Sequence, residues 1–155
     1  MTICNLTELP KMLEKGQRLL GIDLGEKTIG LALSDPGRTI ASPLETLRRT
    51  RFSSSVETLC ALMDQHTIGA VVIGLPLNMD GSEGPRCQSA RQFADNLLKK
   101  IDTTIAFWDE RLSTVAVTRT LLEADMSRKR RAEVVDKMAA AYILQGALDR
   151  LKETP

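Results

Sequence analysis

Residues 18–33 read RLLGIDLGEKTIGLAL, and this stretch decides how the fold begins. Two apolar runs, residues 19–24 and 29–33, are separated by the turn-forming sequence GEKT at residues 25–28. The pattern predicts a β-hairpin. After a turn at Asp35-Pro36-Gly37, a third strand is predicted from Thr39 into the Leu44–Leu47 region. The sheet is therefore expected to begin with three antiparallel neighbours.

The remainder of the chain alternates between helical and strand patterns. An apolar stripe from Val56 to Met63 predicts a helix, residues 70–75 a buried strand, residues 90–101 a second helix and residues 104–108 a fifth strand. Two more helices are predicted, one starting near Ser113 and one from about Ala132 to Leu151, with a basic segment between them. This order predicts an α/β sandwich with a mixed five-stranded sheet and flanking helices.

The length and composition predict one domain. The chain has 155 residues, 43% hydrophobic and 26% charged, which suits a single soluble core. We predict this domain over residues 18–152, and we interpret residues 1–17 as an N-terminal extension that packs on the surface or frays. Neither a membrane helix nor a secretory signal is visible, so we expect a cytoplasmic protein without a membrane partner.

Cysteine, histidine and charge patterns limit the chemistry. Cys4, Cys60 and Cys87 have no CxxC spacing and are odd in number, which favours reduced thiols over disulfides or zinc. His66 is the only histidine, and its position favours a surface or cap role. The net charge is only +1, but basic residues gather at positions 48–51 and again at 128–131. Such local clusters permit a phosphate-facing surface.

Acidic residues interrupt apolar patterns at three places. Asp23 lies within an apolar strand, on the same face as Gly21 and Gly25, whose lack of side chains leaves room for a metal and a phosphate. The simpler alternative is a strand-end aspartate that hydrogen-bonds to a turn. Asp109 and Glu110 end another strand and must point to opposite faces. The residues alone leave open which of these two acids points towards Asp23 and which is solvated or paired with Arg111. Trp108, which precedes them, is interpreted as a core residue.

Asp136 is the third candidate, because it lies on the apolar stripe of the last predicted helix together with Ala139, Ala140 and Ile143. The alternative is an aspartate in the first turn that is favoured by the helix dipole. Three converging acids without histidine or cysteine would make an all-oxygen site, which suits Mg2+ or Mn2+ rather than zinc. Two such ions would activate water for phosphodiester cleavage.

Two further segments carry candidate nucleic-acid contacts. The loop from Asn78 to Gly84 leads into a helix N-terminus and could present backbone N–H groups to a phosphate, although such a loop is often only a turn. The basic segment could hold the nucleic-acid backbone, although such a run is commonly a solvated connector. The predicted nucleic-acid-binding residues are Asn78, Arg111, Arg128, Lys129, Arg130 and Arg131.

Four segments together resemble the bacterial YqgF/RuvX family: GIDLG at residues 21–25, VIGLPLNMDG at 72–81, DERLST at 109–114 and DKMAA at 136–140. GIDLG alone also resembles the phosphate strand of actin-like ATPases, but the four motifs in this order are specific. The resemblance implies a RuvC-like member of the ribonuclease H-like fold, a three-layer sandwich. By this resemblance, Asp23, Glu110 and Asp136 are the catalytic, metal-binding acids, and Glu110 is preferred over Asp109.

The resemblance also implies a function, a nuclease that matures the 5′ end of pre-16S ribosomal RNA in ribosomal precursor particles. Some family members resemble Holliday junction resolvases, so branched DNA is the alternative substrate. A resolvase would require a dimer to cut symmetrically, whereas a monomer suffices for RNA, and we favour the monomer. A third class is a non-catalytic binder of the ribosome or of a transcription complex. The chain is too short for both lobes of an actin-like ATPase.

Overall fold

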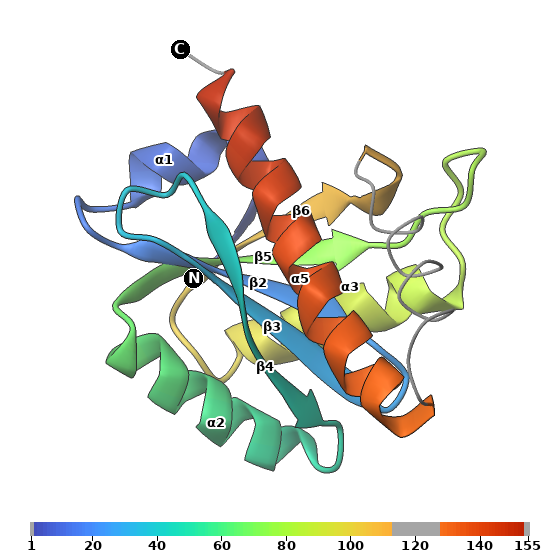
Figure 1. Cartoon of the computed structure of the whole chain (residues 1–155). Helices are drawn as coiled ribbons and strands as arrows, with labels where there is room; N and C mark the ends of the chain where they lie inside the picture. The colour runs from blue at the N-terminus through green and yellow to red at the C-terminus, as the bar shows by residue number, and fades with distance from the viewer. Residues whose placement is uncertain (1, 113–127, 154–155) are drawn as a thin grey trace.

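The computed structural model describes residues 2–112 and 128–153, and for residues 128–136 it describes the backbone only. Three consecutive strands, β2 to β4, are followed by strands and helices that alternate along the chain (Figure 1). In order they are β1 (Thr2–Cys4), η1 (Leu6–Glu8), α1 (Leu9–Met12), β2 (Arg18–Leu24), β3 (Thr28–Ser34), β4 (Ala41–Arg48), α2 (Phe52–Gln65), β5 (Ile68–Leu75), α3 (Pro85–Leu98), β6 (Thr104–Asp109), η2 (Glu110–Leu112) and α5 (Arg128–Lys152).

The strands form one mixed sheet in the order β1-β6-β5-β2-β3-β4. The predicted antiparallel meander is present, because β3 pairs antiparallel with both β2 and β4. The other neighbours run parallel, with β5 between β2 and β6. The predicted α/β sandwich with a mixed sheet is therefore confirmed, but the sheet has six described strands and not five.

The sixth strand comes from the segment that we interpreted as an extension. Thr2, Ile3 and Cys4 pair in parallel with residues 104–106 of β6. A few residues later, the side chain of Leu9 is fully buried against the sheet. The expectation that residues 1–17 only pack on the surface or fray was therefore wrong for β1 and Leu9. A strand of three residues has too few alternating positions for its pattern to be recognised.

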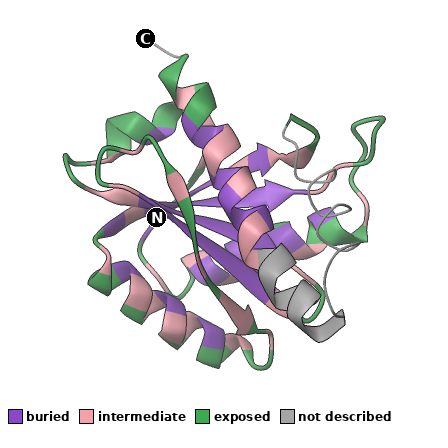
Figure 2. Ribbon diagram, in the orientation of Figure 1, coloured by how far each residue is buried: buried purple, intermediate pink, exposed green. Residues whose placement is uncertain are grey.

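The sheet separates two hydrophobic cores (Figures 1 and 2). One face of the sheet is covered by α2 and α3, and Leu20, Ile22 and Ile73 lie in that core. The other face is crossed by α5, whose Ala140, Leu144 and Ala147 are fully buried. Small residues on both sides allow this close approach: a Cβ added at Gly21 would lie 2.8 Å from Leu144 Cβ. The acids must therefore be located relative to these two faces.

Helix α5 begins at Arg128, four residues earlier than predicted. The basic segment at residues 128–131 is consequently the first turn of this helix rather than a connector before it. The helix predicted to start near Ser113 lies outside the described residues. His66 is the C-cap residue of α2, as predicted, and the three cysteines are free. Among the described helices, none has the length and apolar character to cross a membrane.

Candidate active site

The carboxyl ends of three parallel strands meet at one edge of the sheet. Asp23 is the last but one residue of β2, Asp109 ends β6, and Glu110 follows at the start of η2. The loop that contains Asn78 leaves β5 at the same edge. The fold thus brings two of the three predicted acids and one predicted nucleic-acid-binding segment to one place.

Asp23 is buried within the sheet, with only 2% of its surface exposed. It pairs with Gly30 of β3, and it lies on the face of the sheet that carries Gly21. This is the α5 face, since Ala140 and Leu144 are the nearest neighbours of Gly21. The neighbours Ile22 and Leu24 point into the opposite core. A carboxylate buried in this way requires compensating positive charge or hydrogen bonds.

Glu110 lies on the same face, next to Gly74 of β5. A Cβ added at Gly74 would lie 3.2 Å from Glu110 Cδ and 2.5 Å from Ile143 Cδ1 of α5. The parallel pairing of β2 with β5 extends to Ile22 and Ile73, and the next residues in that register are Asp23 and Gly74. Gly74 therefore occupies the strand between the two acids. Its missing side chain allows Ile143 and Glu110 to approach the sheet closely at this point.

Asp109 has a different environment, because it is paired with Arg111. Arg111 Nε donates to both carboxylate oxygens of Asp109 at 3.1 Å, and Arg111 Nη2 donates to Asp109 Oδ2 at 2.7 Å. These hydrogen bonds lower the pKa of Asp109. The sequence alone allowed either acid of this pair to be the one bound by Arg111. The structure assigns the ion pair to Asp109 and leaves Glu110 beside Gly74.

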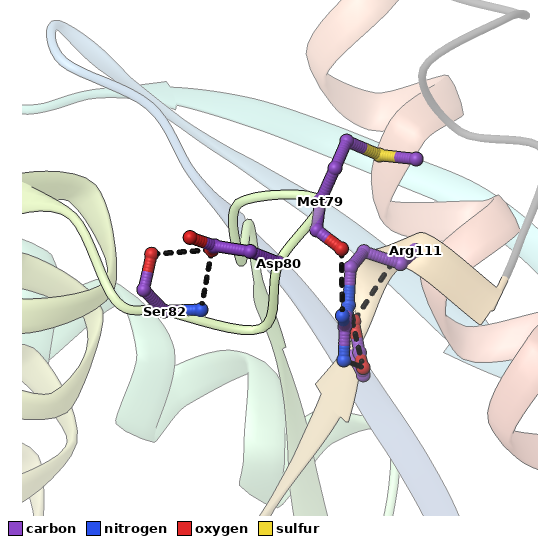
Figure 3. Close-up of polar contacts among 5 residues, drawn as sticks. Met79, Asp80, Ser82 and Arg111 are labelled. Carbon is purple, nitrogen blue, oxygen red and sulfur yellow. Dashed lines mark hydrogen bonds and ion pairs between the residues drawn. The ribbon is translucent and has the colours of Figure 1, made fainter.

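Arg111 also contacts the loop that follows β5 (Figure 3). Its Nη1 donates to the carbonyl oxygen of Met79 at 3.3 Å. Within the loop, Asp80 Oδ1 accepts hydrogen bonds from the amide and the hydroxyl of Ser82, at 2.9 and 2.6 Å, and these bonds lower the pKa of Asp80. Gly81 between them has φ +87°, a conformation that favours glycine. The loop is thus a hydrogen-bonded turn attached to the strand end by one guanidinium.

The predicted nucleic-acid-binding roles of Asn78 and Arg111 stay predictions, although both residues have structural contacts. Asn78 Nδ2 donates to Ser82 Oγ at 3.0 Å, and Arg111 joins Asp109 to Met79. Gly74 and Asp80 were not among the residues predicted from the sequence to belong to the site. An isolated glycine inside a buried strand indicates a close approach, and the Asp-Gly-Ser sequence at 80–82 indicates an Asx turn. Both signals are present in the sequence.

The third acid lies on a helix whose backbone is described. Asp136 precedes Ala140 by one helical turn of α5, and Ala140 is the residue whose carbonyl oxygen lies above Gly21. The side chain of Asp136 lies outside the described residues, as do those of Arg128, Lys129, Arg130 and Arg131. Among the side chains that are described, no group of three acids, histidines or cysteines is placed to hold a metal ion.

Known proteins match this chain over nearly its whole length. The model of a family named RuvX, described as "Holliday junction resolvase", matches residues 17–150. A protein of Paramagnetospirillum magneticum named "Putative pre-16S rRNA nuclease" is 66% identical over 149 residues, which cover 96% of each chain. A protein of Rhodospirillum centenum with the same name is 58% identical over 158 residues, covering 99% of this chain and 84% of its own.

The fold is also similar to that of a solved structure. "T. thermophilus RuvC in complex with Holliday junction substrate" superposes with a TM-score of 0.54 at 12% sequence identity, covering 89% of this chain and 97% of that one. At this identity the likeness concerns the fold, and it confirms the predicted ribonuclease H-like architecture.

Proposed function

The chain belongs to the RuvX family, and from this premise we propose that it is a divalent-metal-dependent nuclease that matures the 5′ end of pre-16S ribosomal RNA in the cytoplasm. The observation that carries the proposal is the position of Asp23 and Glu110 on either side of Gly74, on one face and at one edge of the sheet. Two close relatives named for pre-16S rRNA support the substrate. Asp136 is proposed as the third acid.

The residues at this edge fit Mg2+ or Mn2+. Carboxylate oxygens are the ligands that these ions prefer, and a divalent cation is a partner that a buried carboxylate such as that of Asp23 can accept. The missing side chain of Gly74 lets Glu110 lie close to the strand that neighbours Asp23. A bound divalent cation would supply positive charge against the scissile phosphate and would lower the pKa of the attacking water.

The protein's own contribution is rigid positioning. The backbone of Asp23 is held by the pairing of β2 with β3, which fixes the position of this residue on the sheet. Glu110 begins η2 directly after β6, and its neighbours Asp109 and Arg111 are locked in an ion pair. Through Met79, Arg111 also fixes the loop after β5 at the edge where RNA would enter. Such preorganisation is what places reacting groups productively.

The proposal is tested by cleavage of a pre-16S 5′-leader RNA and of a four-way DNA junction, side by side, with Mg2+ or Mn2+ and with a chelator. We expect metal-dependent, RNA-selective cleavage that falls by orders of magnitude in Asp23→Asn, Glu110→Gln and Asp136→Asn. Glu26→Gln is the matched control, because Glu26 is an exposed acid in the turn after β2. Calorimetric titration with Mn2+ should show metal binding that Asp23→Asn weakens and Glu26→Gln does not.

The same experiment distinguishes the alternatives. The description of the family model favours one of them, a Holliday junction resolvase, which predicts junction-selective cleavage by a dimer in sedimentation experiments. Binding of RNA without cleavage of either substrate, unchanged in Asp23→Asn, would favour a non-catalytic ribosome or transcription-complex binder. Wild-type cleavage rates in all three acid variants would refute the assignment of the site.

A further inference from the structure

A cavity of about 310 Å3 lies on the face of the sheet opposite α5, between α2, α3 and the ends of β3 and β4. We call it the Arg49 pocket. Its lining contains one cation, five uncharged polar residues and three apolar residues, with no carboxylate among them. The lining residues are Ile29, Arg49, Thr50, Phe52, Ser55, Ser89, Gln92, Phe93 and Asn96. This composition suits an anionic ligand with a polar, planar part.

Arg49 is held in place by two hydrogen bonds to neutral acceptors. Its Nη1 donates to the carbonyl oxygen of Gly25 at 2.9 Å, and its Nη2 donates to Ser89 Oγ at 3.3 Å. Both acceptors are neutral. Among the described residues, Arg49 forms no ion pair, in contrast to Arg91 and Arg111. A guanidinium that is preorganised in this way and half-buried is a strong phosphate ligand.

The start of α2 adds to the attraction for an anion. The helix begins at Phe52, directly after Thr50 and Arg51, and its N-cap residue makes no side-chain hydrogen bond to the first turn. Unsatisfied N–H groups at this end favour a negative charge. Ser55 in the same turn lines the pocket and is only 5% exposed, yet its hydroxyl makes no hydrogen bond to another described residue. Its oxygen is therefore available to a ligand that enters the pocket.

The outer part of the pocket has groups that suit a nucleobase. Gln92 Nε2 donates to Asn96 Oδ1 at 3.0 Å, so the carbonyl oxygen of Gln92 and the amide nitrogen of Asn96 can meet a donor and an acceptor on a base edge. The half-buried Phe52 ring is supported by edge-to-face packing on Phe93, with centroids 5.7 Å apart. The volume is near the lower end of the roughly 300–1,000 Å3 of ligand pockets and suits one nucleotide.

The pocket lies at the same edge of the sheet as the candidate active site, on the opposite face. Gly25, whose carbonyl oxygen binds Arg49, is two residues after Asp23. Ile29 pairs with Leu24, and Thr50 follows the end of β4, so the pocket lies at the sheet edge that carries the acids. An RNA strand that passes Asp23 on the α5 face can cross this edge of the sheet and reach the opposite face within a few nucleotides.

We propose that the Arg49 pocket binds one nucleotide of single-stranded RNA beside the cleavage site, with its phosphate on Arg49 and its base at Gln92 and Asn96. This inference rests on the proposed function for the identity of the polymer. The pocket then selects an unpaired nucleotide, because a base held in a helix cannot enter a pocket that surrounds it. It would therefore determine where the RNA is cut.

The test is binding of a fluorescent ten-nucleotide single-stranded RNA to the full chain in a chelator, by anisotropy at several salt concentrations. We expect Arg49→Gln to weaken binding about tenfold. The slope of the logarithm of the binding constant against the logarithm of the salt concentration, the salt slope, should become smaller by about 0.7. Arg48→Gln is the control, because it removes the same charge from an exposed neighbour outside the pocket. Gln92→Ala should weaken binding several-fold without changing the salt slope, whereas Gln88→Ala, an exposed glutamine on the same helix, should not.

Equal effects of Arg49→Gln and Arg48→Gln, or of Gln92→Ala and Gln88→Ala, would overturn the proposal. Adenosine monophosphate that binds as tightly as the RNA would also overturn it, in favour of a small-molecule site. Since Arg49 joins the β2–β3 turn to α3, each variant is first checked by thermal unfolding; if Arg49→Gln fails to fold, the two glutamine variants still decide the outcome. The chelator separates this result from catalysis: failure of pre-16S cleavage leaves the binding differences unaffected.

Discussion

Substitution of Gly74 by alanine tests whether the space between the two acids matters for catalysis. The added methyl group would lie 2.5 Å from Ile143 Cδ1, 3.1 Å from Ile143 Cγ1 and 3.2 Å from Glu110 Cδ. Ile143 is fully buried, so its displacement should cost about 1–3 kcal/mol of unfolding free energy, as overpacking usually does. Glu110 must also move by a few tenths of an ångström. We expect cleavage to fall roughly tenfold or more, since misplacement of a catalytic group by about 1 Å can cost a hundredfold.

The double variant Gly74→Ala/Ile143→Val separates the two effects. It removes the Cδ1 atom that would clash most closely and keeps the contact with Glu110. Unfolding in urea should show that the double variant recovers stability, while the cleavage rate of the same leader RNA stays low. Gly146→Ala is the matched control, because its added Cβ would lie 2.8 Å from the Trp108 ring in the same helix–sheet interface. If Ile143→Val restored both stability and cleavage, the space above Gly74 would have only a packing role.

Three further outcomes are expected. Arg111→Ala should speed amide hydrogen exchange in the loop around Gly81 and lower the cleavage rate several-fold, whereas Arg86→Ala should do neither. Unchanged exchange would show that hydrogen bonds within the loop are sufficient to order it. Hydrogen bonds from Ile40 and Thr39 lower the pKa of Asp35 to about 2, so the ionised side chain stabilises the fold at pH values above its ordinary pKa of 3.8. The difference in melting temperature between wild type and Asp35→Asn should therefore shrink as the pH falls from about 4 towards 2, and a constant difference would contradict this expectation. Neutralising residues 128–131 should weaken RNA binding and flatten its salt dependence, by about 0.7 in slope for each phosphate that the protein no longer neutralises; an unchanged slope would refute that role.

The sequence was sufficient where a repeating pattern spans a whole element. Two apolar runs separated by a turn-forming sequence in residues 18–33 predicted the β2–β3 hairpin, and the continuous apolar run at residues 70–75 predicted the buried β5. The alternation of side chains along a β-strand placed Asp23 and Gly21 on one face, and the structure puts that face under α5. The family resemblance that four motifs carried is confirmed. These features depend on local periodicity, which a single sequence displays.

The sequence was insufficient where the outcome depends on pairing between distant segments. The three residues of β1 acquire their role only by pairing with β6, and the start of α5 lacks an apolar stripe that would have indicated a helix at Arg128. Alternation showed that Asp109 and Glu110 point to opposite faces, but the choice between faces depends on the register that sets Trp108 beside Gly74. The Arg49 pocket has four contributing segments, so no single stretch indicates it.

The close packing of α5 on the sheet links the fold to the proposed chemistry. Gly21 and Gly74 admit Ala140, Ile143 and Leu144 so closely that an added Cβ would lie 3.0 Å or less from an atom of each residue. A helix held at this distance has no freedom to slide along the sheet, so the residue one turn before Ala140 keeps a constant position along the strands. That residue is Asp136. The glycines therefore do more than permit close packing. They allow a rigidly held helix to position the third proposed acid, which a flexible loop could not do.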